Sequence, residues 1–286
     1  MVTSPTPPSM IERMTVIMDA FDGANARLTL QEIAGRSGLP RSTTHRILDQ
    51  LVRLRWLDHR GTDYGLGMRS LELGGLAVAH NSLREATAPL LHDLHLRTAT
   101  TVHLCVLDQL DVVYLDKVAG RSGADLPTRV GGRSPAHATA AGKAILAWTD
   151  PRQVEAMFAG KLVSRTPRTL ATMEALQQEL TAVRARGGLA YEREESVLGV
   201  ACVAAPLRGG GRAVAAVSLA GDVRRMDLHR LAPFVQETAR QASAALFPAD
   251  HQARRKRARA EEPVPAAWPP GTLERVVEGI GGDYWL

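Results

Sequence analysis

Cysteine, aromatic residues and long apolar runs are all scarce in this sequence of 286 residues. Its two cysteines, Cys105 and Cys202, are far apart and form no paired motif, which excludes a disulfide framework and a cysteine zinc site. There is no charged start followed by an apolar stretch, and no run of about 18 apolar residues that would span a membrane. We therefore expect a soluble, cytoplasmic protein without a membrane partner.

Charge of one sign is not strongly dominant either. The formal net charge is +5, an excess that favours an anionic partner only where the basic residues are clustered. Hydrophobic residues make up 45% of the chain and charged residues 23%. At this length, such a composition predicts two domains that each have a core of their own.

Helix-start signals recur at the N-terminal end, after a proline-containing arm over residues 1–8. Ser9 and Glu12 have the spacing of a capping box and open an amphipathic pattern that continues to about Asp22. Thr29 and Glu32 repeat this spacing ahead of a second, shorter helix. Two capped helices in close succession are thus predicted.

A third helix and a hairpin follow. The helix is predicted to begin near Arg41, after Gly38 has ended the second helix, and two short extended runs at 55–58 and 63–66 then flank a turn. Three helices followed by a hairpin make a winged helix-turn-helix, which we assign to residues 9–67.

One face of this third helix is basic and rich in hydrogen-bond donors. Its apolar residues, Ile47, Leu51 and Leu54, share the opposite side. A helix fits the major groove of DNA, where arginine reads guanine. A short polar face alone is ordinarily only a solvated surface, but the surrounding helix-turn-helix and hairpin favour DNA binding. The candidate DNA-contacting residues are Arg41, Ser42, Thr43, Thr44, His45, Arg46 and Arg53 of the helix and Arg60 of the hairpin.

Residues 68–98 again have a helical pattern, in which Ser82 and Glu85 form a third capping-box spacing. Gly74, Gly75 and Pro89 are expected to break or bend it. We assign residues 68–82 to a linker helix and residues 83–247 to a second domain.

The second domain is predicted to be α+β with a mainly antiparallel sheet. Strands are expected at 101–108, 111–118, 200–207 and 213–219, and helices at 140–148, 151–158, 172–186 and from Asp227 to about Phe247. Residues 248–286 are basic and proline-rich without periodicity, which predicts a disordered tail.

Several segments, in this order, resemble the signatures of the IclR family of bacterial transcriptional regulators. They are LTLQEIAGRSGLPRSTTHRILDQL (28–51), YGLGMRSLELG (64–74), HATAAGKAILA (137–147), SRTPRTL (164–170), EESVLGVACVAAPL (194–207) and AAVSLAG (215–221). The resemblance covers about residues 9–247. It implies a winged helix-turn-helix joined to a GAF-like effector-binding domain, and dimers or tetramers that bind double-stranded operator DNA.

The resemblance also implies an effector pocket formed by the backbone around Ala140 and Ala141 and by the side chains of Glu192, Cys202 and Ser218. Family pockets often have a glycine at the position of Ala140 and a second serine at that of Ala220. A less polar pocket, suited to an aromatic or longer acid, is therefore expected. Taken singly, Cys202 would fit a buried core thiol and Glu192 a solvated strand end.

The segment HATAAGKAIL invites comparison with a phosphate-binding loop. A P-loop needs glycine at the position of His137 and serine or threonine at that of Ala144, so this interpretation fails. The small residues would let backbone N–H groups at a helix start approach a carboxylate. Close packing of the helix on a sheet explains them equally well.

An enzyme would need paired carboxylates among Glu192, Glu194 and Glu195, or bases such as His103 and His137. The sequence contains no G-x-S-x-G or H-E-x-x-H motif, and its nine histidines show no metal-ligand spacing. We expect no catalytic residues, metal or cofactor. An architectural DNA-binding protein without a ligand remains an alternative, which binding assays with metabolites would separate from a repressor whose operator affinity depends on an acidic effector.

Overall fold

A computed structural model describes residues 9–21, 27–79, 81–120 and 126–249 of the chain. The predicted arm and nearly all of the predicted tail lie outside these residues. The first helix ends at Asp19, with Ala20 as its C-cap, and does not continue to Asp22 as predicted. The chain divides into two compact units, Met1–Glu85 and Ala86–Leu286. Within the described ranges, we find no helix whose length and apolar character would let it span a membrane.

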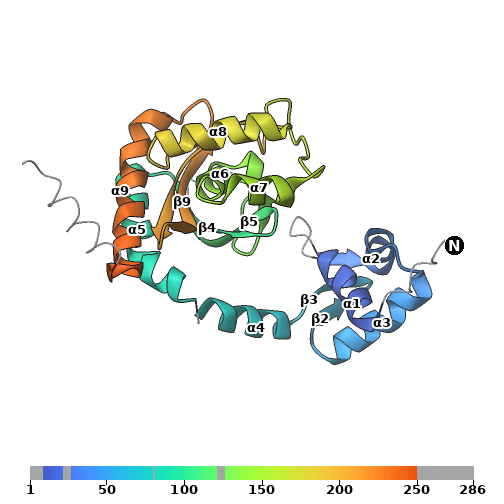
Figure 1. The fold of residues 1–286 in the computed structure, drawn as a ribbon. Coiled ribbons are helices and arrows are strands. Elements are labelled where there is room, and N and C mark those ends of the chain that lie inside the picture. The colour runs from blue at the N-terminus through green and yellow to red at the C-terminus, as the bar shows by residue number, and fades with distance from the viewer. Residues whose placement is uncertain (1–8, 22–26, 80, 121–125, 250–286) are drawn as a thin grey trace, which may run out of the picture. The chain divides into compact units, whose positions relative to one another are not determined.

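The N-terminal unit is the predicted winged helix (Figure 1). Its elements are α1 (Met10–Asp19), β1 (Arg27–Thr29), α2 (Leu30–Ser37), α3 (Arg41–Arg53), β2 (Leu57–Arg60), β3 (Asp63–Leu66) and α4 (Met68–Ala79). Both predicted capping boxes are confirmed: the Glu12 amide donates to Ser9 Oγ at 3.2 Å, and the Glu32 amide to Thr29 Oγ1 at 3.3 Å. The αL conformation of Gly38, with φ of 67°, ends α2.

The wing differs from the prediction in two respects. Its first strand begins at Leu57 and not at Arg55, because Arg55 adopts a left-handed conformation with φ of 65° directly after α3. The three-residue strand β1 joins the hairpin, so the sheet has the order β1-β3-β2. Leu28 of β1 lies opposite Tyr64, and both are buried in the core of this unit.

The predicted capping box at Ser82 is wrong. Ser82 is the first residue of α5 (Ser82–Thr98), and Asn81 caps the helix, since its Oδ1 accepts from the Arg84 amide at 3.0 Å. The glycines 74 and 75 lie inside α4 and do not break it; the interruption falls between Ala79 and Ser82. Asparagine is as good a cap as serine, and here it stands one position earlier.

The C-terminal unit contains a six-stranded antiparallel sheet of order β6-β5-β4-β9-β8-β7. The strands are β4 (Thr101–Asp108), β5 (Asp111–Val118), β6 (Arg133–Pro135), β7 (Ala190–Arg193), β8 (Val200–Gly209) and β9 (Arg212–Asp222). The predicted strands are all present, whereas β6 and β7 add the two edges.

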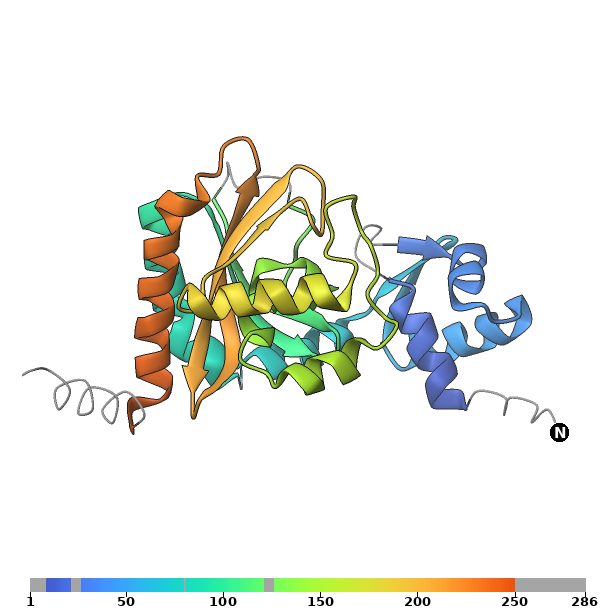
Figure 2. The same ribbon diagram turned by 45° about the horizontal axis from the view of Figure 1, so that its top comes forward.

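Residues 215–220 of β9 are all buried, so both faces of the sheet are covered there. Its helices are α6 (Ala140–Leu146), α7 (Pro151–Phe158), α8 (Met173–Ala185) and α9 (Leu228–Leu246), preceded by a short 3-10 helix, η1 (Ala136–Ala138). Figures 1 and 2 show α9 lying beside α5, where the Arg97 guanidinium sits 5.0 Å from the Phe234 ring centroid. The predicted cap of α9 is confirmed, since Asp227 Oδ1 accepts from the Arg230 amide at 3.1 Å.

Candidate functional site

Most of the predicted outward face of α3 is exposed: Arg41, Ser42, His45, Arg46 and Arg53 are exposed, and Thr43 is half-buried. Ile47 and Leu51 are buried on the opposite side as predicted, together with Leu48, but the placement of Leu54 there was wrong, because Leu54 follows the last turn of α3 and is 56% exposed. Thr44 is 0% exposed, and its hydroxyl donates to the Pro40 carbonyl at 3.1 Å. A direct DNA contact by Thr44 is therefore ruled out; the residue is part of the turn that starts α3.

Two acidic residues hold predicted DNA-contacting side chains in place. Asp49 Oδ2 lies 3.3 Å from His45 Nδ1 one turn along α3. On the wing, Asp58 Oδ2 lies 3.0 Å from Arg60 Nε and 3.3 Å from Arg27 Nη1. The Arg60 side chain still exposes 77% of its surface, so the tether orients it without covering it.

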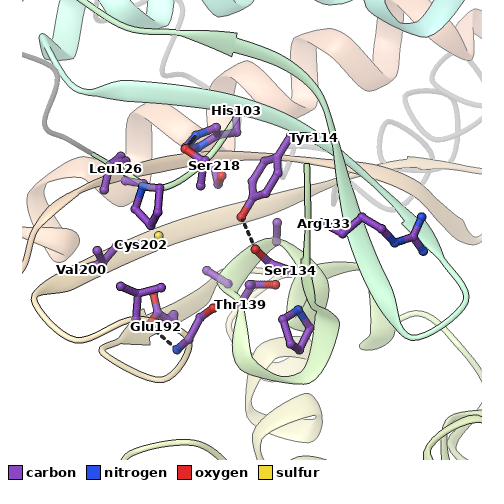
Figure 3. Close-up of a pocket in the computed structure, with 18 of the residues that line it drawn as sticks. His103, Tyr114, Leu126, Arg133, Ser134, Thr139, Glu192, Val200, Cys202 and Ser218 are labelled. Atoms are coloured by element: carbon purple, nitrogen blue, oxygen red, sulfur yellow. Dashed lines mark hydrogen bonds between the residues drawn. The ribbon is translucent and has the colours of Figure 1, made fainter. Parts of the chain in front are cut away.

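A cavity of about 200 Å³ lies in the C-terminal unit, between the sheet and the start of α6 (Figure 3). Every residue of the predicted pocket lines it: Ala140, Ala141, Glu192, Cys202 and Ser218. Ala220, at the position of the family's second serine, also belongs to its wall. The walls come from six strands, the start of α6 and the loop segments beside them, so that residues more than 100 positions apart in the chain meet here.

Hydroxyl groups and a neutral imidazole line one side of the cavity. The Tyr114 hydroxyl donates to Ser134 Oγ at 3.1 Å, and His103 Nε2 lies 2.8 Å from Thr128 Oγ1. Burial, assisted by the nearby Lys117 charge, lowers the pKa of His103 to about 3. This wall is thus polar but uncharged at neutral pH. The sequence alone makes His103 a candidate base, a role that a neutral imidazole with so low a pKa does not fit.

Glu192 supplies a buried carboxyl group on another side of the cavity. It is 2% exposed, and its Oε1 accepts hydrogen bonds from the amides of Glu195 at 2.6 Å and Ser196 at 3.3 Å. Burial raises the pKa of Glu192 to about 7, although these two amides oppose the shift. The alternative of a solvated strand end is excluded for this residue.

Cys202 lies next to this carboxyl group, and it is both a thiol of the core and a residue of the cavity wall. Burial first, and then the neighbouring Glu192, raise the pKa of the Cys202 thiol well above its usual value. The thiol therefore stays protonated and presents a neutral group to the cavity.

The small residues at the start of α6 have a packing explanation. A Cβ atom at Gly142 would overlap the carbonyl oxygen of Ala136 in η1. The Gly142 amide is also occupied, since it donates to Thr139 Oγ1 at 3.1 Å. Close packing accounts for the glycine, and the alanines 140 and 141 form the cavity wall on this side.

A buried ion pair joins α6 to the turn after β7, and no sequence pattern predicts it. Lys143 is 1% exposed, and its Nζ lies 2.6 Å from Glu195 Oε1 and 3.9 Å from Glu179 Oε1. The lysine of the rejected phosphate loop thus neutralises a carboxylate of the protein. Lys143 and Glu195 are 52 positions apart, and no local pattern relates them.

The three glutamates considered for catalysis have separate partners. Strand β7 ends at Arg193, because Glu194 adopts a left-handed conformation with φ of 60°. Glu194 then pairs with Arg168 at 3.1 Å, while Glu195 pairs with Lys143 and Glu192 faces the cavity. No group of three potential metal ligands occurs in the described part of the chain.

Two family models match the chain. The IclR helix-turn-helix domain matches residues 10–61, and the C-terminal domain of the bacterial transcriptional regulator IclR matches residues 75–245. The chain belongs to the IclR family. Membership in the IclR family makes it a DNA-binding transcriptional regulator and not an enzyme, with the winged helix as its DNA-binding domain.

Individual IclR-family proteins resemble it over most of its length. The HTH-type transcriptional regulator XynR of Escherichia coli (strain K12) is 36% identical over 240 residues, which cover 82% of this chain and 94% of XynR. The transcriptional repressor IclR of the same organism is 31% identical over 217 residues, covering 74% of this chain and 79% of the repressor. An IclR homologue from Microbacterium hydrocarbonoxydans, solved in complex with 4-hydroxybenzoate, has a TM-score of 0.71 and 28% identity and covers 83% of this chain and 99% of its own.

Proposed function

We propose that this regulator is a repressor whose operator affinity is set by a small organic acid bound in the cavity. The observation that carries the proposal is the meeting of Ala140, Ala141, Glu192, Cys202 and Ser218 around one cavity. These residues come from separate segments of the sequence. Their convergence supports the effector pocket that the family resemblance implies.

For DNA, we propose that the exposed side chains of α3 enter the major groove and that the wing contacts the phosphate backbone. The groove-facing set consists of Arg41, Ser42, Thr43, His45, Arg46 and Arg53, with Arg60 on the wing. We assign residues 9–67 to this domain, 68–82 to a linker helix and 83–247 to the effector domain.

For the effector, we propose an aromatic or longer carboxylic acid. The Microbacterium homologue was crystallised with 4-hydroxybenzoate, and the cavity of this chain offers hydroxyl donors, a neutral histidine and an apolar wall at Ala220. Alanine at position 220 removes a hydroxyl that would favour a more polar ligand.

We propose that a second copy of the chain covers the apolar side chains of α4. Leu71 is 67% exposed and Leu76 is 54% exposed, and no residue of α4 is buried. An unburied apolar helix is typical of a protein interface. A dimer built there would present two α3 helices to half-sites about one DNA turn apart, and an effector coupling of about 1–3 kcal/mol would change operator affinity about 5- to 150-fold.

Fluorescence anisotropy tests the proposal. The protein is titrated against the intergenic DNA upstream of its own gene, with unrelated DNA as competitor at about 0.15 M salt, in the presence and absence of aromatic and aliphatic acids. We expect binding at least about 10³-fold tighter than to the competitor, and release by one of the acids. Tight binding that no acid alters would instead favour an architectural protein that uses its second domain only for assembly.

A further inference from the structure

One cationic side chain at the cavity has no counter-charge within the described residues. Arg133 also lines the cavity, but its guanidinium is occupied by Asp108 at 2.8 Å and Asp111 at 3.2 Å. Arg165 lines the cavity and is exposed, and within the described ranges its guanidinium forms no ion pair or hydrogen bond. Among the described residues that line the cavity, Arg165 is therefore the one cation without a carboxylate partner.

The backbone that carries Arg165 is fixed against the cavity wall. The Arg165 amide donates to Thr169 Oγ1 at 2.9 Å, and this hydroxyl donates in turn to the Glu195 carbonyl at 2.6 Å. Thr166 Oγ1 donates to the Glu194 carbonyl, also at 2.6 Å. Segment 164–170 is thus tied to the turn after β7, which itself contributes Ser196 to the wall. The Arg165 backbone therefore has a fixed position beside the cavity that its residue lines.

Apart from Arg165, no ionisable side chain that lines the cavity supplies an unpaired positive charge. His103 is neutral, and Glu192 is a buried carboxyl group whose Oε1 already accepts two backbone amides. A ligand carboxylate near Glu192 would place two acidic groups in one buried site, where only one of them can be ionised. An arginine, in contrast, presents a planar fork of donors that matches one carboxylate.

We propose that Arg165 selects the effector by pairing with its single carboxylate, and that Glu192 rejects ligands that bring a second one. This inference rests on the proposed effector site and names its ligand class: monocarboxylic acids whose remainder is neutral. Arg165 is then a specificity-determining residue that lies outside the set implied by the family resemblance.

Isothermal titration calorimetry on the full-length protein tests this assignment. The probes are benzoate, 4-hydroxybenzoate, phenylacetate and octanoate, each beside its primary amide, with terephthalate and suberate as dicarboxylates. For the monocarboxylate that binds most tightly, we expect Arg165→Ala to weaken the affinity by about tenfold or more. The affinity for the primary amide of the same acid should fall by less than about threefold. Arg165→Lys should retain part of the acid preference. Arg152→Ala, which removes an exposed arginine of α7 away from the cavity, is the matched control.

The second half of the inference predicts a gain. Glu192→Gln should tighten dicarboxylate binding relative to monocarboxylate binding by about tenfold, because it removes the acidic neighbour and keeps the shape. Equal losses for acid and amide in Arg165→Ala, or an unchanged acid affinity, overturn the role of Arg165 while the effector site stands. A wild-type protein that binds none of the acids overturns both proposals. Thermal unfolding of each variant separates these results from misfolding.

Discussion

The two units of the molecule use the same types of polar residue in opposite ways. On α3, serine, histidine and arginine side chains are exposed within one thirteen-residue helix. Around the cavity, serine, histidine and glutamate are buried and come from separate strands. The side chains of the first arrangement are in contact with solvent. The second has groups whose protonation depends on burial and on specific partners.

The ion pairs of the two units show the same contrast. The side chains of His45 and Asp49 on α3 are 55% and 62% exposed, whereas those of Lys143 and Glu195 are 1% and 12% exposed. Exposed pairs contribute about 0–1 kcal/mol, but breaking a buried pair costs about 3–5 kcal/mol. Substitutions of exposed residues on α3 should therefore alter DNA binding alone, and substitutions in the Lys143–Glu195 pair should alter the free energy of unfolding.

The largest expected effect is that of Lys143→Met. Loss of this cation leaves the Glu195 carboxylate buried without its partner at 2.6 Å, and we expect a loss of about 3–5 kcal/mol in the free energy of unfolding. Urea denaturation measures it. The double variant Lys143→Met/Glu195→Leu should recover most of the loss, and Lys161→Met, at an exposed position, should change little. A single variant within about 1 kcal/mol of wild type would contradict the contrast between buried and exposed pairs.

The next effect is a pH dependence caused by Glu192. Its pKa in the folded protein, about 7, is above its ordinary value of 4.5, so the folded state binds the extra proton. The stabilisation is complete below about pH 4.5 and is lost as the pH rises through about 7. From pH 5 to pH 8, the free energy of unfolding of wild type should fall by about 2–3 kcal/mol more than that of Glu192→Gln.

Urea denaturation of both proteins at the two pH values gives this difference directly. Groups that do not interact with Glu192 titrate equally in wild type and variant, so their contributions cancel in the comparison. A stability difference that stays constant from pH 5 to pH 8 would show that the carboxyl group is not held protonated by burial.

Arg46→Ala should act on DNA binding alone. Arg46 is exposed on the face of α3 opposite its buried leucines, and loss of a base or phosphate contact should weaken operator affinity about ten- to hundredfold. Anisotropy measures the affinity, and the unfolding midpoint should not move. Arg240→Ala removes an exposed arginine of α9 as a control. Unchanged operator affinity in Arg46→Ala would remove this residue from the interface.

The smallest effect is expected for Ser218→Ala, at a buried position of the cavity wall. The Ser218 hydroxyl shares a hydrogen bond with the Cys105 thiol and faces the ligand space. Its loss should weaken the releasing acid about three- to tenfold while operator affinity without the acid is retained. A full response of the variant to the acid would exclude Ser218 from the ligand contacts.

The fold was predictable from the sequence wherever a signal is local. Ser9 with Glu12 and Thr29 with Glu32 mark helix starts within four residues, and the structure contains both capping boxes. The box at Ser82 was wrong because Asn81 offered a competing cap one position earlier. Strands of three residues, such as β1, carry too little periodicity to be detected and are set by their pairing partners.

The cavity was predictable only in part. The residues implied by the family resemblance do line it, but their protonation depends on burial, which spacing does not reveal. The Lys143–Glu195 pair joins residues 52 positions apart. Thr44 belongs to the donor-rich start of α3 in the sequence, but the fold buries it completely. Contacts of this range follow from the packed fold and leave no local pattern.

The packing of α6 against η1 constrains how this binding site can diversify. Ala140, Ala141, Ala144 and Gly142 are all buried, and Gly142 has no room for even one methyl group. A larger side chain at Gly142 would displace α6 from η1. Descendants of this protein that respond to new metabolites should therefore have changed residues of the strands and of segment 164–170, and kept the packing of α6 against η1.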